Sequence, residues 1–167
     1  NGSQNLDLVT AQDNWLDSNT AVNGNSDGIY IGADSNLITN NLTENNIGSG
    51  FFINTGGTNT VTGNVSVRNQ SYGFQLLNST ANYLYNNRAD SNSDWNLYLQ
   101  GTSQDNRIDS NTVVNGNLYG ILLLSDSNLI TNNLAEQNLR NNLYLSGADL
   151  NTITGNTGAG SGIHLTV

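Results

Sequence analysis

Short runs in which apolar and polar residues alternate recur along this chain at a nearly constant interval. Each run opens with glycine or asparagine and continues with an apolar, a variable and a second apolar residue; the copies span residues 28–31, 50–53, 73–76, 96–99, 120–123, 142–145 and 162–165. Alternation with a period of two is typical of a β-strand with one buried face. We therefore predict that the apolar residues of each run point inward and the variable residue points outward.

A second run lies between consecutive copies of the first. It consists of an asparagine, an aliphatic residue two positions later and another asparagine three positions after that: Asn14/Leu16/Asn19, Asn36/Ile38/Asn41, Asn59/Val61/Asn64, Asn82/Leu84/Asn87, Asn106/Ile108/Asn111, Asn128/Ile130/Asn133 and Asn151/Ile153/Asn156. The leading asparagines are 22 to 24 residues apart. A fixed period in this range, without a helix-length apolar face, is the signature of a β-solenoid.

The predicted fold is all-β: a right-handed parallel β-helix of about seven turns, each with 22 to 24 residues and three short strands. Equivalent residues of neighbouring turns would lie about 4.8 Å apart, so we expect the asparagine columns to form ladders of side-chain hydrogen bonds. Residues 16–64 also match residues 108–156 at an offset of 92 residues, or four turns. We expect a single domain, residues 1–167, with this internal duplication.

The asparagine-led rungs, Asn-x-Ile-x-x-Asn followed by Gly-Ile-x-Leu, resemble the right-handed parallel β-helix repeats of carbohydrate-binding proteins and sugar hydrolases. The proteins with such repeats include NosD-like proteins, pectin-degrading enzymes and mannuronan epimerases. The resemblance covers essentially the whole chain. It implies an extracellular or cell-surface protein that handles polysaccharides or lies among them. The repeated motif is the structural rung itself, so it indicates the fold and no particular activity.

Composition narrows the possible partners. The net charge is −9, with 13 acidic residues against four cationic ones, and all four cations are arginine. Nucleic acid is an unlikely partner class because it would require a basic track. Cysteine is absent, which excludes disulfides and thiolate metal sites. No run approaches the roughly 18 apolar residues of a membrane span.

The acidic residues do not form a catalytic cluster in the predicted fold. Asp17 and Asp109 share a column but lie four turns apart, so no catalytic residue is assigned. Asp105, Asp126 and Asp149 stand before leading asparagines in three successive turns, where they could hold calcium or simply cap the corners. Apart from this calcium, no cofactor is expected. His164, the only histidine, has no acidic or nucleophilic neighbour in register.

An apolar stripe is predicted on the outside of the rod. It contains Tyr30, Phe52, Tyr98, Leu122 and Tyr144 in the outward column, with Tyr72, Trp95 and Tyr119 beside it. Such a stripe could bind sugar rings, join rods side by side, or stabilise the sheet by cross-strand contacts. Separately, the sequons at Asn69 and Asn78 are expected in turns where they could be glycosylated.

The first and last strands of the predicted solenoid occupy the same column. Leu6 and Leu8 correspond to Ile163 and Leu165, and neither end carries the polar cap that solenoids ordinarily need. The leading hypothesis is therefore a non-catalytic extracellular structural solenoid that stacks end to end into filaments or a sheath, with itself as partner. The alternative is a glycan-binding module, or a fragment of a carbohydrate-active enzyme of the polysaccharide lyase or epimerase type, with polysaccharide as partner.

Overall fold

The computed structural model describes residues 4–160 and 162–166, with the backbone alone for residues 165 and 166, and its elements are short parallel strands. They form three sheets, which we call A, B and C. Sheet A contains β1 (Leu6–Val9), β4 (Ile29–Gly32), β7 (Phe51–Asn54), β10 (Phe74–Leu77), β13 (Leu97–Gln100), β16 (Ile121–Leu123), β19 (Leu143–Ser146) and β21 (Ile163–Thr166). Sheet B contains β2 (Trp15–Asp17), β5 (Leu37–Thr39), β8 (Thr60–Thr62), β11 (Tyr83–Tyr85), β14 (Arg107–Asp109), β17 (Leu129–Thr131) and β20 (Thr152–Thr154). Sheet C contains β3 (Thr20–Val22), β6 (Leu42–Glu44), β9 (Val65–Val67), β12 (Arg88–Asp90), β15 (Thr112–Val114) and β18 (Leu134–Glu136).

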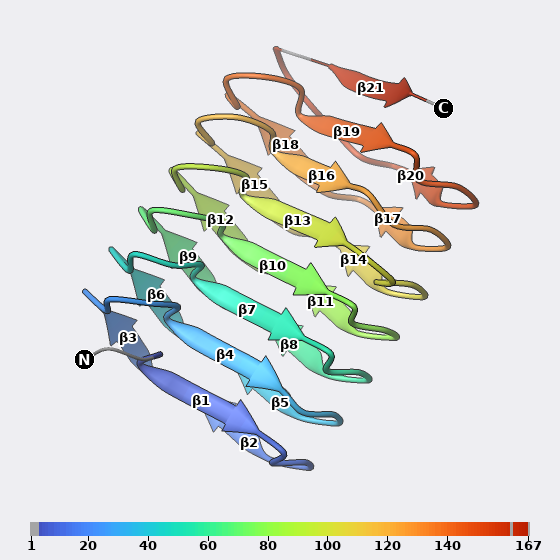
Figure 1. The fold of residues 1–167 in the computed structure, drawn as a ribbon. Coiled ribbons are helices and arrows are strands. Elements are labelled where there is room, and N and C mark those ends of the chain that lie inside the picture. Colours follow the sequence, from blue (N-terminus) through green and yellow to red (C-terminus); the bar gives the residue numbers. More distant parts are fainter. Residues whose placement is uncertain (1–3, 161, 167) are drawn as a thin grey trace.

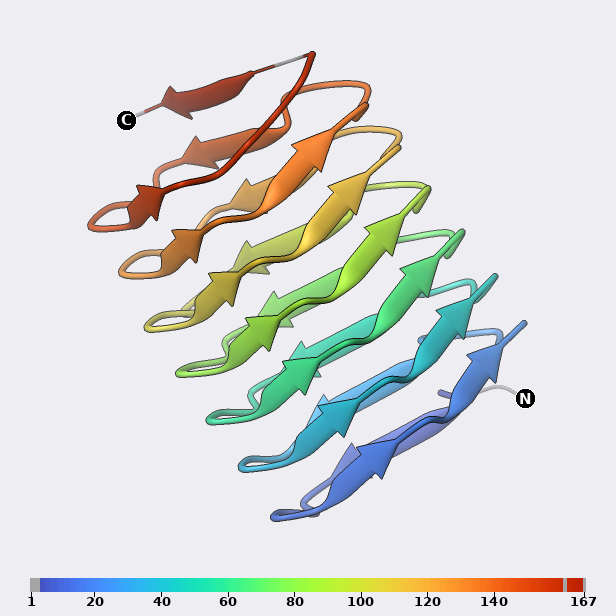
Figure 2. The same ribbon diagram turned by 180° about the vertical axis from the view of Figure 1, so that it is seen from behind.

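The chain coils from sheet A to B to C and then returns to A one level higher, so that strands three apart in the sequence lie side by side (Figure 1). In the last turn β20 leads directly to β21, which pairs with β19. From behind, the strands of sheets B and C climb the rod in the same regular steps (Figure 2). We number the turns from β1–β3 as turn 1 to β19 and β20 in turn 7. The predicted all-β solenoid, with about seven turns of three strands, is confirmed.

The core runs along the axis of the rod and contains the inward residues of all three sheets. Ile29, Ile31, Ile53, Leu76 and Leu99 of sheet A are fully buried, as the alternation predicts. The largest inward side chains, Phe51 and Phe74, stack with centroids 4.7 Å apart. Sheet C contributes small inward side chains, among them Thr43 and Ser66, which are 0% exposed. A Cβ on Gly50 would lie 2.0 Å from Ser66 Oγ, so this position admits only glycine.

The two predicted asparagine ladders are present, and their amides are hydrogen-bonded to one another. Asn64 Oδ1 accepts bonds from the backbone N–H and the Nδ2 of Asn41 in the preceding turn, at 2.8 and 3.0 Å. Its own Nδ2 donates to the Ile38 carbonyl at 2.8 Å and to Asn87 Oδ1 at 3.0 Å. Both hydrogens and both lone pairs of the amide are thus used. Leaving such a buried group unpaired would cost about 1–3 kcal/mol.

A third ladder, which the sequence pattern did not indicate, lies at the corner between sheets C and A. It contains Asn46, Asn69, Asn92 and Asn138. Asn69 is 0% exposed and donates to Asn92 Oδ1 at 3.1 Å. The expectation that Asn69 lies in an accessible turn and could be glycosylated is therefore wrong, because its amide is part of the interior.

Glycine interrupts this third ladder in turns 1 and 5, at Gly24 and Gly116. In turn 5 the missing amide comes from Asn96, which precedes β13 and donates to Asn138 Oδ1 at 3.2 Å. A Cβ on Gly116 would lie 2.8 Å from Asn96 Nδ2. Glycine and asparagine have thus exchanged places between the two corner positions of one turn, and Asn5 fills the gap at Gly24 in the same way.

Candidate functional surfaces

The aromatic residues predicted on the outside of the rod gather on the outer face of sheet A. The middle residues of its strands form one column, which contains Tyr30, Phe52, Gln75, Tyr98, Leu122, Tyr144 and His164. A second column lies beside it, two residues before each strand, and includes Tyr72, Trp95 and Tyr119. We call the set Tyr30, Phe52, Tyr72, Trp95, Tyr98, Tyr119, Leu122 and Tyr144 the aromatic surface.

The centre of the aromatic surface is two layers deep. Tyr98 and Leu122 point away from the core, yet they are only 5% and 3% exposed. The ring of Trp95 lies 4.4 Å from that of Tyr98, edge to face, and Tyr72 lies 5.2 Å away. Tyr98 is therefore a packing residue beneath the neighbouring column, Leu122 is equally buried, and a ligand would meet the half-exposed rings first.

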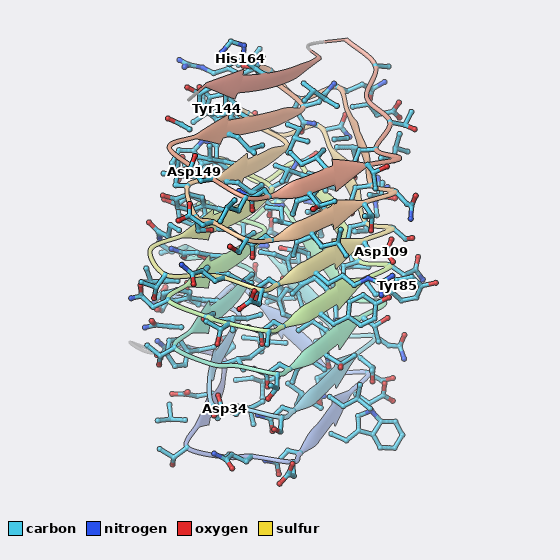
Figure 3. The ribbon with its side chains drawn as sticks, turned by 90° about the vertical axis from the view of Figure 1, so that its right-hand side faces the viewer. Asp34, Tyr85, Asp109, Tyr144, Asp149 and His164 are labelled. Atoms are coloured by element: carbon cyan, nitrogen blue, oxygen red, sulfur yellow. The ribbon has the colours of Figure 1, made fainter. Side chains whose placement is uncertain are left out.

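Most rings of this surface stack on one another along the axis of the rod. Tyr72 and Trp95 are within 17° of parallel, with centroids 5.1 Å apart. Tyr119 and Tyr144 are 4.8 Å apart at 11°, and His164 continues the stack from Tyr144 at 5.4 Å and 13°. Figure 3 shows Tyr144 and His164 one above the other near one end of the rod. Because neighbouring rings cover each other's faces, the stacked part offers solvent mainly ring edges.

Burial and nearby acidic groups set the charge of this face. Burial raises the pKa of the Tyr72 phenol, and the Asp94 carboxylate adds to the effect. Burial, followed by the proximity of Tyr72, also raises the pKa of Tyr98. At the edge of the face, burial raises the pKa of Asp27, although the backbone N–H of Ser49 donates to its Oδ1 at 2.7 Å and opposes the shift. The phenols of Tyr72 and Tyr98 therefore remain neutral at physiological pH.

The aspartates considered for calcium lie at the corner between sheets A and B. Asp126 Oδ1 accepts the backbone N–H of Asp149 at 2.8 Å, which is a corner-capping contact; Figure 3 labels Asp149 on this side of the rod. Asp105 lines an open recess of about 360 Å³ together with Arg107 and Leu150. Within residues 4–160 and 162–166, no group of three or more His, Cys, Asp or Glu side chains could hold a metal ion. Calcium at Asp105, Asp126 and Asp149 stays a prediction.

The residues predicted for end-to-end stacking belong to the two outermost strands of sheet A. Leu6 and Leu8 of β1 are half-buried and pack against the core. Ile163 of β21 is 51% exposed, and the side chain of Leu165 lies outside the described residues. In the part of the chain that the structure describes, β1 pairs only with β4 and β21 only with β19.

The outer face of sheet B holds a hydrogen-bonded group that the sequence alone did not identify. Asp17 Oδ1 accepts bonds from Thr39 Oγ1 at 2.5 Å and from Asn40 Nδ2 at 3.0 Å. Thr39 Oγ1 in turn accepts the indole N–H of Trp15 at 2.8 Å, while Trp15 remains 70% exposed. The bonds from Thr39 and Asn40 lower the pKa of Asp17. The same residue types, aspartate, threonine and asparagine, recur at positions 109, 131 and 132 of the duplicated block. This recurrence was the signal in the sequence that could have identified the group.

The equivalent carboxylate in turn 5, Asp109, also has a cationic partner. Arg107 donates to its Oδ2 at 2.6 Å, and the guanidinium lies 4.8 Å over the ring of Tyr83. Burial by itself would raise the pKa of Asp109, but hydrogen bonds from Asn132 and Arg107 outweigh it and lower the pKa to about 2. In Figure 3, Asp109 and Tyr85 lie on the opposite side of the rod from Tyr144 and His164.

The comparison with protein families gives one match, to the model described as a right-handed beta helix region, over residues 3–158. The chain belongs to the right-handed β-helix family. The coiling of sheets A, B and C is the structural counterpart of that match. No curated protein and no solved structure matches the chain. Among residues 4–160 and 162–166, the structure has no helix of the length and apolarity required to cross a membrane.

Proposed function

We propose that this right-handed β-helix protein is a non-catalytic structural rod, located outside the cell or at its surface, that assembles with other copies of itself. The observation that carries the proposal is that side chains along the rod are used in contacts with their own neighbours in adjacent turns. Within each of the three asparagine ladders, the side-chain amides of adjacent turns are hydrogen-bonded to one another. On sheet A, aromatic rings of adjacent turns stack along the axis of the rod. Such columns stabilise a rod and leave few free groups for chemistry.

The outermost strands of sheet A, among the residues that the structure describes, support assembly through the end turns. β1 and β21 occupy the same sheet, and pairing of β21 with β1 of a second copy would continue its parallel ladder. Unpaired strand edges are ready templates for such pairing. The half-exposed side chain of Ile163 would then be covered by the next turn, as Leu143 is covered in the chain itself.

Electron microscopy and light scattering at rising protein concentration test this assembly. We expect rods that lengthen with concentration, and we expect Ile163→Lys to abolish lengthening because it places a charge at the inward position of the edge strand. His164→Lys, one residue further along the same strand and pointing outward, is the matched control and should still assemble. A wild-type protein that remains monomeric at every concentration would exclude the proposal.

Glycan binding at the aromatic surface is the second candidate function. One observation favours it: Tyr30 and Phe52 pack perpendicular to each other, at 86°, and so do not cover each other's faces as the parallel pairs Tyr72–Trp95 and Tyr119–Tyr144 do. Asn54 Nδ2 donates to the Tyr30 hydroxyl at 3.2 Å, which adds a polar group beside the rings. Binding on a glycan array that is lost in Phe52→Ala, without any rod lengthening, would favour this function over assembly.

A further inference from the structure

The pairing of aromatic ring, guanidinium and carboxylate in turn 5 is a complete cation site built from the chain's own residues. Arg107 lies between the ring of Tyr83 in the preceding turn and the carboxylate of Asp109 on its own strand. Cation–π attraction and a charge-assisted hydrogen bond act together on one guanidinium. Asn132 holds the carboxylate in place from the following turn, at 3.1 Å.

Turn 1 repeats the carboxylate of this arrangement and its amide partner, but an aromatic residue stands in the place of the cation. Asp17 takes the place of Asp109 and accepts the amide of Asn40, as Asp109 accepts that of Asn132. Position 15, equivalent to that of Arg107, is a tryptophan. In the part of the chain that the structure describes, the ion pairs join Arg68 to Glu44, Arg88 to Asp90 and Arg107 to Asp109, and Asp17 takes part in none.

The ring and the carboxylate of turn 1 are both fixed and both accessible. The indole N–H of Trp15 is bonded to Thr39, whose hydroxyl donates to Asp17, so one chain of hydrogen bonds orients the two groups. Trp15 nevertheless leaves 70% of its surface exposed. Asp17 Oδ2 accepts a single bond, from Ser18 at 3.0 Å, and retains a free lone pair. A pre-oriented site loses little entropy when a ligand binds.

We propose that Trp15 and Asp17 bind a guanidinium group supplied from outside the chain, as an arginine side chain of a basic partner peptide. The guanidinium would stack on the indole and donate to Asp17 Oδ2, so that it makes the same two kinds of contact as Arg107. The ring and the carboxylate would come from one strand, β2, whereas Arg107 lies over Tyr83 of the preceding turn and donates to Asp109 Oδ2. The net charge of −9 favours a cationic partner at long range. An anionic partner is disfavoured for the same reason.

Titration with N-acetyl-arginine amide at low ionic strength, followed by the indole N–H signals in NMR, tests the site. The protein has two tryptophans, and a Trp95→Phe variant assigns the signals. We expect a saturable shift of the Trp15 signal while the Trp95 signal stays in place. The neutral analogue N-acetyl-citrulline amide should shift neither. Asp17→Asn should weaken the binding by about fivefold or more, since it removes the charge but not the shape. Asp109→Asn is the matched control and should leave the Trp15 titration unchanged.

Three results would overturn the inference. The first is the absence of a saturable Trp15 shift. The second is equal binding of the citrulline analogue, which would mean that charge plays no part. The third is a Trp15 response to a neutral oligosaccharide with none to the arginine probe, which would identify a sugar-binding ring instead. A loss of affinity as ionic strength rises to about 0.15 M supports the site, because exposed charges are screened at that concentration.

Discussion

Turns 1 and 5 are four turns apart and share two features: a glycine in the third ladder with an asparagine beside it, and an aspartate on the outer face of sheet B. The surroundings of these features differ between the two turns. Both have a glycine in the third ladder, and an asparagine at the other position of the same corner supplies the missing amide. In turn 5, the Asn96 side chain makes four hydrogen bonds and is 0% exposed. In turn 1, the Asn5 side chain makes two with the residues that the structure describes, and it is only half-buried.

The same contrast holds on sheet B. Asp109 is 5% exposed and paired with Arg107, whereas Asp17 is half-buried and beside an exposed tryptophan. The duplicated residues form the same local contacts, but neighbours on both sides determine how completely those contacts are buried. Identical sequence features should therefore have larger energetic effects in turn 5 than in turn 1, because a buried polar group left without a partner costs more than an exposed one.

The largest expected effect is that of Gly116→Asn, which forces a second amide into the space of Asn96. We expect a loss of about 4 kcal/mol in the free energy of unfolding, from overpacking and displaced hydrogen bonds. Adding Asn96→Gly should restore stability to within about 1 kcal/mol of wild type, since turn 5 would then resemble turn 4, with Gly73 and Asn92 at these positions. Urea unfolding of the two single variants and the double variant measures the coupling. If the free-energy changes of the two single variants simply add in the double variant, the amide of Asn96 does not occupy the space that Gly116 leaves open.

A smaller effect is expected when the bridging asparagine is removed. Asn96→Ala should cost about 3 kcal/mol, whereas Asn5→Ala should cost about 1 kcal/mol, because more buried partners lose their hydrogen bonds in turn 5. Unfolding midpoints in urea at constant slope give both values. Equal losses in the two turns would contradict the role assigned to burial.

The smallest expected effect concerns acid stability. The pKa of Asp109 is lowered to about 2 in the folded protein from an ordinary value of 3.8. Its ionised form therefore stabilises the fold above pH 4, and this contribution is lost as the pH falls from about 4 towards 2. Asp109→Asn should flatten the decline of stability in that window more than Asp17→Asn does. Thermal unfolding measured between pH 5 and 2 makes the comparison, and a wild-type curve parallel to that of Asp109→Asn would refute it.

Much of the fold was predictable because a solenoid repeats one local rule. The alternation at 28–31 and 50–53 and the asparagines spaced like Asn41 and Asn64 indicated the strands, their inward faces and two ladders. The third ladder was not recognised, because two of its positions are Gly24 and Gly116 and the period is visibly broken there. The replacement amides come from Asn5 and Asn96, which lie 19 and 20 positions earlier in the chain, and only the coiled backbone brings them to the gap.

The candidate surfaces were predictable in membership but not in arrangement. The sequence indicated that Tyr98, Leu122 and the neighbouring aromatic residues lie outside the core. It could not indicate that Trp95 and Tyr72 cover Tyr98, because this depends on side-chain directions at a corner. It also gave no reason to join Thr39 to Trp15 and Asp17, because Thr39 lies one full turn further along the chain.

By itself, the sequence determined the all-β solenoid, its period of 22 to 24 residues and its four-turn duplication, because in-register apolar residues and amides can be satisfied only by stacked parallel strands. Only the tertiary structure decided which outward groups are buried and which are free. Asp17 and Asp109 are the same residue type in the same column, yet one has a guanidinium partner and the other faces solvent beside an exposed indole. The reason is that burial and charge pairing depend on neighbouring turns, which a local sequence pattern does not contain.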